Sequence, residues 1–306
     1  MLDIIGIGDA DVDLIVQVDH IPAHDEKIRG TLLGKFPGGI IGNFCAAAAR
    51  FGATTGVVAK LGKDEFGDLC LSDFIKRGIN IDGMVQKENE DTYFSIIHLD
   101  HTGEKALTII QTNGFLPKKE EINLEYVRGA RYVHMTTLDV DLVDYVFGHL
   151  ESECILSLDI EATASKATPQ VWNRVLQKLN IAFPNLAGLQ ALTGQNDIDK
   201  GACYLLDRGV KIVVVTCGVQ GVKIFKDNYY FEHPIYRVDV KDTTGAGDCF
   251  NAVFMASLSK GWPIEKAAKY ASAAAAISIQ FVGAREGLPT CTEVELFLKN
   301  LGDLAS

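Results

Sequence analysis

Residues 242–248 are the part of the sequence whose residue types are best suited to chemistry. They read Asp-Thr-Thr-Gly-Ala-Gly-Asp and lead into an apolar run that is typical of a helix. Gly245, Ala246 and Gly247 leave the backbone uncovered, so their N–H groups can converge on an anion where the helix begins. Asp248 could simply stabilise the helix N-terminus, but the glycines beside it favour a catalytic role. An anion pocket next to a carboxylate suits phosphoryl transfer, because the carboxylate can accept the proton of a hydroxyl.

A second group of carboxylates follows the first apolar run, residues 4–7. Asp9, Asp11 and Asp13 would lie at the carboxyl end of a parallel strand, which is the usual ligand site of an open α/β sheet. Carboxylates at this place can accept hydrogen bonds from the adjacent hydroxyls of a polyol. A solvated acidic turn explains the same residues equally well, so this segment alone leaves both interpretations open.

A glycine-rich loop precedes the next predicted helix. Gly38 and Gly39, followed by Asn43, allow the backbone to approach a ligand closely. The Asn43 amide is either the N-cap of the helix or a ligand contact, and in isolation the N-cap interpretation is favoured.

Composition and missing motifs exclude several classes of protein. The formal net charge of −11 argues against a nucleic-acid surface. The sequence has no Walker loop, no histidines at metal-ligand spacing and no nucleophile elbow. Seven cysteines without a C-x-x-C pair predict reduced thiols and a cytoplasmic location. We expect neither a secretory signal nor a membrane anchor.

Strands and helices alternate along most of the chain, and these elements must position the polar residues. Six β-branched runs are each followed by a helical pattern, which predicts a mostly parallel sheet covered by helices. The runs are residues 4–7, 55–59, 132–135, 155–160, 181–183 and 211–216. Thr168 and Pro169 predict the start of one helix, and Thr292 with Glu295 predicts a capping box for the last helix.

Residues 12–37 and 91–111 interrupt this alternation. They alternate apolar and polar residues without a helical period, which predicts antiparallel strands of a small β-sheet lid. Such a sheet has one apolar face to cover, so it should pack over the main domain, another subunit, or both. The predicted division is a core of residues 1–11, 38–90 and 112–306 with a lid of residues 12–37 and 91–111.

Six motifs together resemble the ribokinase-like sugar kinases, the PfkB carbohydrate kinase family. They are Gly38-Gly39-x-x-Gly42-Asn43, Leu61-Gly62-x-Asp64-x-Phe66-Gly67, Asn185 before Leu192-Thr193-Gly194, Val214-Val215-Thr216-x-Gly218-x-x-Gly221, residues 242–248, and Gly283-Ala284 before Leu288-Pro289-Thr290. The resemblance implies a three-layer α/β fold with a central, mostly parallel sheet and a small lid. It also implies ATP-dependent phosphorylation of a hydroxymethyl group of a sugar or nucleoside.

The same resemblance implies roles for individual positions. Asp248 would be the base, and the N–H groups of Gly245, Ala246 and Gly247 the anion hole. The substrate would be held by Asp11, Asp13, Gly38, Gly39 and Asn43. The nucleotide site would contain Thr216, Gly218 and Gly221, with Asn185 helping to order Mg²⁺ and phosphate. A monovalent cation such as K⁺ would bind near Asp242 and Thr244, closed by the region around Gly283, and the lid strands would form a homodimer.

Two departures from the family pattern affect the expected chemistry. Gly188 stands where the family commonly has Glu, so the water shell of Mg²⁺ loses a carboxylate, and either activity falls or another acid substitutes. Ile40 replaces a Lys that often follows the paired glycines. An apolar side chain there cannot pair with a substrate phosphate, which disfavours sugar phosphates as substrates.

Three hypotheses follow from these residues. The first is a cytoplasmic ATP-dependent kinase that acts on the primary hydroxyl of an unphosphorylated sugar, with residues 8–14 and 37–39 more like fructokinases than ribokinases. The second is a nucleoside kinase, in which Phe36, Tyr93 or Phe94 would stack on a base. The third is a sugar-binding or regulatory relative without turnover. Gly188 motivates this third hypothesis, and the intact Asp248 speaks against it.

Overall fold

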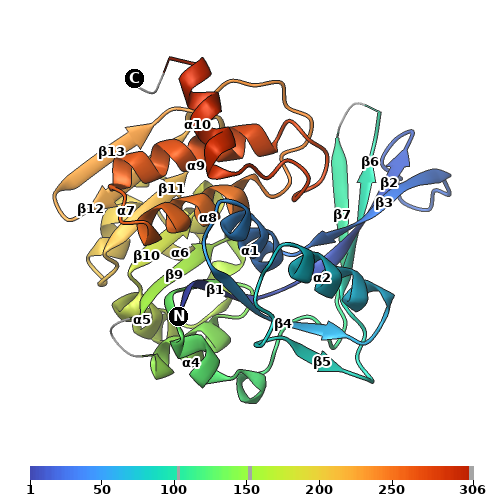
Figure 1. Cartoon of the computed structure of the whole chain (residues 1–306), viewed down its shortest axis with the longest axis horizontal. Helices are drawn as coiled ribbons and strands as arrows, with labels where there is room; N and C mark the ends of the chain where they lie inside the picture. The colour runs from blue at the N-terminus through green and yellow to red at the C-terminus, as the bar shows by residue number, and fades with distance from the viewer. Residues whose placement is uncertain (102–103, 151–153, 303–306) are drawn as a thin grey trace.

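The computed structural model describes residues 1–101, 104–150 and 154–302, and it contains a large sheet enclosed by helices and a small sheet beside them (Figure 1). The strands are β1 (Leu2–Gly8), β2 (Asp11–Val18), β3 (Gly30–Gly38), β4 (Thr55–Gly62), β5 (Val85–Lys87), β6 (Phe94–Leu99), β7 (Lys105–Ile110), β8 (Ala130–Thr136), β9 (Ile155–Ile160), β10 (Ile181–Pro184), β11 (Ile212–Thr216), β12 (Val222–Lys226) and β13 (Tyr229–His233).

The helices lie between and after these strands. They are α1 (Ile40–Arg50), α2 (Glu65–Lys76), α3 (Leu124–Arg128), α4 (Val140–His149), α5 (Pro169–Lys178), α6 (Leu186–Thr193), α7 (Ile198–Leu206), α8 (Ala246–Ser259), α9 (Ile264–Ser278) and α10 (Cys291–Asn300), with short 3-10 helices at Lys119–Glu121, Ala162–Lys166 and Gly218–Gln220.

The large sheet is mostly parallel, as predicted. Within the described residues its strand order is β13-β12-β11-β10-β9-β8-β1-β4-β5. Strands β11 to β5 in this order are parallel, and β12 and β13 continue the sheet in antiparallel pairs. The six predicted strands correspond to β1, β4, β8, β9, β10 and β11. Because parallel strands end at the same edge, the loops after β1, β9, β10 and β11 are brought near one another.

Helices cover both faces of this sheet and form two cores. Successive strand residues alternate between them: Ile4 packs in the core that contains α1, α8 and α9, whereas Ile5 packs in the core that contains α4 and α5. Both side chains are fully buried. This alternation explains why the strands are nearly continuously apolar, because each of their faces is covered.

Helix starts agree with the sequence at one position and differ at another. Thr168 caps α5 and Pro169 is its first residue, as predicted. The predicted capping box of Thr292 with Glu295 is wrong, because α10 begins two residues earlier, with Thr290 as the N-cap and Glu293 as its partner. Each of the two threonines is followed three residues later by a glutamate, so the pattern alone does not distinguish them.

The small sheet has the strand order β3-β2-β6-β7. Its outer pairs, β2 with β3 and β6 with β7, are antiparallel, but the central pair of β2 and β6 is parallel, so the prediction of an all-antiparallel sheet is wrong. The reason is that each pair is a hairpin that begins from the main body, so the first strands of the two hairpins, β2 and β6, run in the same direction. One face packs against α2, where the Phe94 ring meets Phe66 with centroids 5.3 Å apart. The other face lines a cavity.

Candidate active site

Two helix N-termini, those of α1 and α8, meet where the small sheet joins the main body. Each helix is preceded by a glycine with a positive φ, 85° at Gly39 and 75° at Gly245. A Cβ atom at Gly39 would lie 2.8 Å from the Cα of Ala10, and one at Gly245 would lie 2.8 Å from the Cβ of Ala284. Both glycines are therefore required by backbone conformation and by space.

Asn43 and Asp248 connect the two helices. The Asn43 side-chain amide donates to a carboxylate oxygen of Asp248 at 2.9 Å, although 205 positions separate the residues in the sequence. Since α1 begins at Ile40, Asn43 lies within the helix, and its interpretation as an N-cap is wrong. Asp9 provides that function instead, because its carboxylate accepts from the N–H groups of Ile40 at 3.0 Å and Ile41 at 3.1 Å.

Arg285 fixes the orientation of Asn43, and the sequence analysis did not identify it. Its side chain is buried, and its Nε donates to the amide oxygen of Asn43 at 2.9 Å, so the NH₂ group of Asn43 is directed to Asp248. The same guanidinium donates to the carbonyl oxygen of Gly38 and, at 2.7 Å, to Asp73. The one available signal was its place directly after Gly283-Ala284 in a recognised motif.

The surroundings of Asp248 adjust its protonation. Burial raises the pKa of Asp248 to about 7, and the negative charges of Asp9 and Glu161 act in the same direction. The hydrogen bond from Asn43 and the positive charge of Arg285 oppose this rise in pKa. A carboxylate with a pKa near neutral pH can take a proton from a hydroxyl and release it again, which suits a general base.

The loop before Asp248 presents backbone amides. Ala246 N–H donates to the carbonyl oxygen of Thr243 at 3.3 Å. Within the described residues, the N–H groups of Gly245 and Gly247 have no acceptor. A Cβ atom at Gly247 would meet no heavy atom within 4 Å, so the space beside it is open. The start of α8 can therefore receive an anion through at least two of the three predicted amides.

The acidic residues after β1 are buried. Asp9 is 1% exposed and Asp11 is 2% exposed, so the interpretation as a solvated turn is wrong. A Cβ atom at Gly38 would lie 2.4 Å from an oxygen of Asp11 and 2.7 Å from one of Asp13, so both carboxylates converge on the uncovered glycine. Asp11 accepts from the Ser95 hydroxyl with one oxygen, and its other oxygen is buried without a hydrogen-bond partner. Hydroxyl donors of a ligand would satisfy such acceptors.

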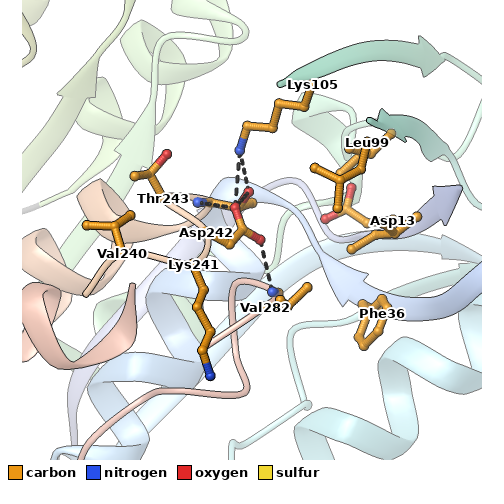
Figure 2. Close-up of a pocket in the computed structure, with 13 residues that line it drawn as sticks. Asp13, Phe36, Leu99, Lys105, Val240, Lys241, Asp242, Thr243 and Val282 are labelled. Carbon is orange, nitrogen blue, oxygen red and sulfur yellow. Dashed lines mark hydrogen bonds and ion pairs between the residues drawn. The ribbon is translucent and has the colours of Figure 1, made fainter. Parts of the chain in front are cut away.

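A cavity of about 270 Å³ lies between the small sheet and the loop that leads to α8 (Figure 2). Asp13, Phe36 and Lys105 line it from the small sheet, and Asp242, Thr243 and Thr244 line it from the loop. Asp11, Asn43 and Asp248 lie outside this lining. We call it the acceptor cavity.

A larger cavity of about 840 Å³ contains the four residues predicted for the nucleotide. It is lined by Asn185, Thr216, Gly218 and Gly221, and also by Ala246 and Gly247. We call residues 242–247, which lead into α8, the anion loop. Most of its lining is apolar, and its volume is within the range of cofactor sites. Val240 and Thr243 line both cavities, so the two cavities adjoin at the anion loop.

Asp242 and Thr244, the predicted ligands of a monovalent cation, are bound to each other and to Lys105. One oxygen of Asp242 accepts from the backbone N–H of Thr244 at 2.9 Å, and the other from Gly283 N–H at 3.0 Å. Lys105 Nζ lies 2.6 Å from the Thr244 hydroxyl and 3.3 Å from Asp242. Burial alone would raise the pKa of Asp242, but these donors hold it below its ordinary value. Within the described residues, no group of three or more His, Cys, Asp or Glu side chains is placed to hold a metal.

The absence of a side chain at position 188 is explained by close packing. A Cβ atom there would lie 1.8 Å from the carbonyl oxygen of Ile160 and 3.0 Å from the Cα of Glu161, so α6 packs too closely against the end of β9 for any larger residue. Asn185 caps α6 through its amide oxygen, 2.7 Å from Gly188 N. Asp159 and Glu161 stand at this same strand end, and burial raises the pKa of both carboxyls.

Known proteins resemble this chain over nearly its whole length. The family described as pfkB family carbohydrate kinase matches residues 1–291. The chain is 29% identical over 306 residues to the ribokinase of Bacillus subtilis (strain 168), covering 97% of this chain and 100% of that protein.

Solved structures are equally similar. Ribokinase from Thermotoga maritima is 28% identical, with a TM-score of 0.88 over 98% of this chain and 100% of that chain. Arabidopsis thaliana ribokinase complexed with ribose and ATP is 26% identical, with a TM-score of 0.85 over 97% and 99% of the two chains. These similarities confirm the predicted family resemblance and fold class. No helix of the described residues is long and apolar enough to span a membrane.

Proposed function

We propose that this chain, which belongs to the pfkB family of carbohydrate kinases, transfers the γ-phosphoryl group of ATP to a primary hydroxyl of an unphosphorylated sugar. The observation that carries the finer proposal is the Asp248 carboxylate, held by Asn43 at 2.9 Å and placed at the open start of α8. The two cavities adjoin at the loop that leads to this helix start.

In this mechanism the acceptor hydroxyl loses its proton to Asp248 as its oxygen attacks the γ-phosphorus of ATP. The bond between this phosphorus and the oxygen that bridges it to the β-phosphate breaks, and ADP leaves with that oxygen. The N–H groups of Gly245 and Gly247 donate to the oxygens of the phosphoryl group, where negative charge accumulates. Asp11 and Asp13 accept hydrogen bonds from the other hydroxyls and fix which hydroxyl faces the base. The small sheet covers the acceptor cavity and limits the access of water, which would otherwise compete as an acceptor.

The residues around Gly188 fit a magnesium ion bound through water. Since no side chain fits at position 188, Glu161 and Asp159 are the nearby acids that can replace the Glu usual in the family. Together with the side-chain amide of Asn185 they would hold the water shell of the ion, which usually retains several waters. When bound, Mg²⁺ supplies positive charge that offsets the charge of the phosphate oxygens.

The proposed substrate is a neutral sugar. Ile40 begins α1 and offers no charge to a substrate phosphate. The Arabidopsis relative was solved with ribose and ATP, which supports a pentose or hexose of similar size as the acceptor. The likeness of residues 8–14 and 37–39 to fructokinases stays a prediction.

A nucleoside kinase is the second candidate, and the structure leaves it less support than the sequence did. Of the three aromatic residues predicted to stack on a base, Tyr93 is buried against Phe115 and Phe94 packs against Phe66. Phe36 lines the acceptor cavity and is the candidate that remains. A single ring could still hold a base from one side.

Assembly and location are further proposals. Leu107 is 53% exposed and Ile109 is 57% exposed on the small sheet, and exposed apolar side chains on a sheet of this size favour coverage by another subunit. We therefore propose a homodimer through the small sheet, which size-exclusion chromatography with light scattering would test. The cytoplasmic location stays a prediction, and all seven cysteines are free in the structure.

An acceptor screen tests the enzymatic proposal. ADP formation is measured with Mg²⁺ and ATP across neutral sugars, sugar phosphates and nucleosides, and each active acceptor is repeated with Asp248→Asn. We expect a neutral sugar to give the highest kcat/KM and the variant to lose this activity. A nucleoside preferred over every sugar would overturn the substrate assignment. Sugar binding without any ADP formation would support the binding-protein hypothesis instead.

A further inference from the structure

We propose that the ammonium group of Lys105 takes the place of a monovalent cation beside Asp242 and Thr244, so that the proposed kinase carries its own cation and does not require K⁺. This inference rests on the proposed function only for its catalytic consequence. Its structural basis is the ion pair in the acceptor cavity (Figure 2).

The ammonium group of Lys105 lies at the two residues that were predicted to bind a monovalent cation. Lys105 Nζ lies 2.6 Å from Thr244 Oγ1 and 3.3 Å from Asp242 Oδ1. Both Asp242 oxygens are already engaged, since Oδ1 also accepts from Thr244 and Oδ2 accepts from Gly283 N–H. A K⁺ ion at these side chains would have to displace the ammonium group or lie beside it, where the like charges repel each other. The residues present therefore do not fit a bound monovalent cation at these side chains.

Asp242 is important because it fixes the loop that becomes the anion hole. Its carboxylate joins Thr244 to Gly283, and its own N–H donates to the carbonyl oxygen of Ile279 at 3.2 Å. Three residues later the chain reaches Gly245, where the amides are uncovered. Hydrogen bonds from Thr244 and Gly283 hold the pKa of Asp242 below its ordinary value, and the positive charge of Lys105 acts in the same direction. The ammonium group therefore adds to the stability of the loop conformation that receives a phosphoryl group.

Lys105 also ties this stabilisation to the small sheet. It is the first residue of β7, whereas Asp242 and Thr244 belong to the loop before α8 (Figure 2). Within the described residues, Lys105 is the one basic side chain that forms an ion pair with Asp242. Because the ammonium group comes from the small sheet, its contacts with Asp242 and Thr244 join this sheet to the loop before α8.

Cation substitution in wild-type protein and in Lys105→Met tests the proposal. Two readouts are used at constant ionic strength: the thermal midpoint of unfolding, which does not depend on turnover, and kcat with the acceptor found in the screen. The salts are KCl, NH₄Cl, NaCl and N-methyl-D-glucamine chloride. Lys35→Met is the matched control, because Lys35 lies on the same sheet and pairs with Glu65 on α2, away from the loop.

Wild-type protein and Lys35→Met should respond to K⁺ and to Na⁺ alike, within about twofold in kcat. Lys105→Met should lose about tenfold in kcat in N-methyl-D-glucamine chloride, the loss of one partly buried charge contact, and recover in NH₄Cl or KCl. Its thermal midpoint should rise with the same two salts. The proposal is overturned if K⁺ raises the thermal midpoint or the kcat of wild-type protein clearly above the Na⁺ values.

Two further outcomes would also overturn it. One is a Lys105→Met protein that matches wild type in every salt. The other is a variant that loses kcat and regains it in no cation, which would assign Lys105 to direct contact with the substrate. Lys105→Gln, whose side chain is one atom shorter than that of lysine but keeps a hydrogen-bond donor, replaces the Met variant if that protein does not fold. If the chain has no kinase activity, the thermal midpoints still decide the question.

Discussion

The N-termini of α1 and α8 have similar backbone geometry but differ in whether their backbone N–H groups have acceptors. Each follows a glycine of positive φ, and each lies at the same side of the molecule. At α1 the first three N–H groups are all satisfied by one residue, because Ile40 and Ile41 donate to the Asp9 carboxylate and Gly42 donates to the Asp9 carbonyl oxygen. At α8 the amides of Gly245 and Gly247 have no such acceptor within the described residues.

This difference indicates which of the two helix starts can bind an external anion. A helix N-terminus attracts negative charge, and Asp9 already supplies that charge to α1. The free donors at α8 leave room for a phosphoryl group, while α1 contributes the Asn43 side chain from one turn further along. We therefore propose a structural role for the start of α1 and a catalytic role for the start of α8, although both carry glycine motifs in the sequence.

Removing the base is the largest expected perturbation of the α8 side. Asp248→Asn should lower kcat by about 10²- to 10⁴-fold, with a much smaller change in KM, because the amide cannot accept the hydroxyl proton. Steady-state kinetics on the acceptor found in the screen measure this. A variant that keeps more than about a tenth of wild-type kcat would show that Asp248 is not the base.

The same variant tests whether Asp248 contributes to catalysis or to the stability of the folded protein. Burial raises the pKa of Asp248 in the folded protein to about 7 from an ordinary value of 3.8. The folded state therefore binds this proton more tightly, and the contribution of Asp248 to stability falls as pH rises from 4 toward 7. At pH 8 the charged group is unfavourable in the fold, so Asp248→Asn should unfold at the same midpoint as wild type or a higher one.

Local sequence patterns predicted the start of α8 and its glycine loop, since three small residues and an acid are adjacent in the chain. They also predicted the strands that lead to the site, because buried parallel strands are almost continuously apolar. The N-cap interpretation of Asn43, which was drawn from its local context, is wrong. Its true partners are Asp248 and Arg285, which lie 205 and 242 positions away.

Lys105 was not predicted for the same reason. It contacts Thr244 from 139 positions away, and only the packing of the small sheet brings the two together. The capping box was predicted at Thr292, but the same pattern occurs at Thr290, where α10 begins. Contacts within one turn or strand can be predicted from residue types, whereas contacts between distant segments depend on the assembled fold.

Arg285→Met should have the next largest effect, because it breaks the connection between Asn43, Gly38 and Asp73. The buried guanidinium serves all three, so its loss leaves acceptors without donors inside the protein. We expect the free energy of unfolding to fall by about 3 kcal/mol, measured by urea denaturation.

Arg174→Met is the control for a general loss of arginine. Arg174 forms a forked pair with Asp144 on the surface, and its removal should change the free energy of unfolding by less than about 1 kcal/mol. Equal effects of the two substitutions would contradict the central role of Arg285.

Opening the start of α1 tests the comparison directly. Asp9→Ala removes the acceptor of the Ile40 and Ile41 amides and should lower the free energy of unfolding by about 2 kcal/mol. Asp248→Ala removes no acceptor of a backbone amide at α8, so its unfolding free energy should change less. Urea denaturation of both proteins at pH 8 measures the difference, and a greater loss for Asp248→Ala would reverse the assignment of the two helix starts.

The smallest expected effect concerns the bond that joins the two helices. In wild type, kcat/KM should rise with pH through about 7, because the base must be ionised to accept a proton and the pKa of Asp248 is raised to about 7 by burial. The Asn43 amide donates to the ionised carboxylate and so lowers this pKa. Asn43→Ala should therefore move the rise in kcat/KM to higher pH and reduce the rate at pH 6.5 by about tenfold, the worth of one hydrogen bond to a charged group. At pH 9 the base is ionised in both proteins, so most of the rate should return. A uniform loss at every pH would instead mean that Asn43 acts on the substrate, and that the bond between α1 and α8 does not adjust the base.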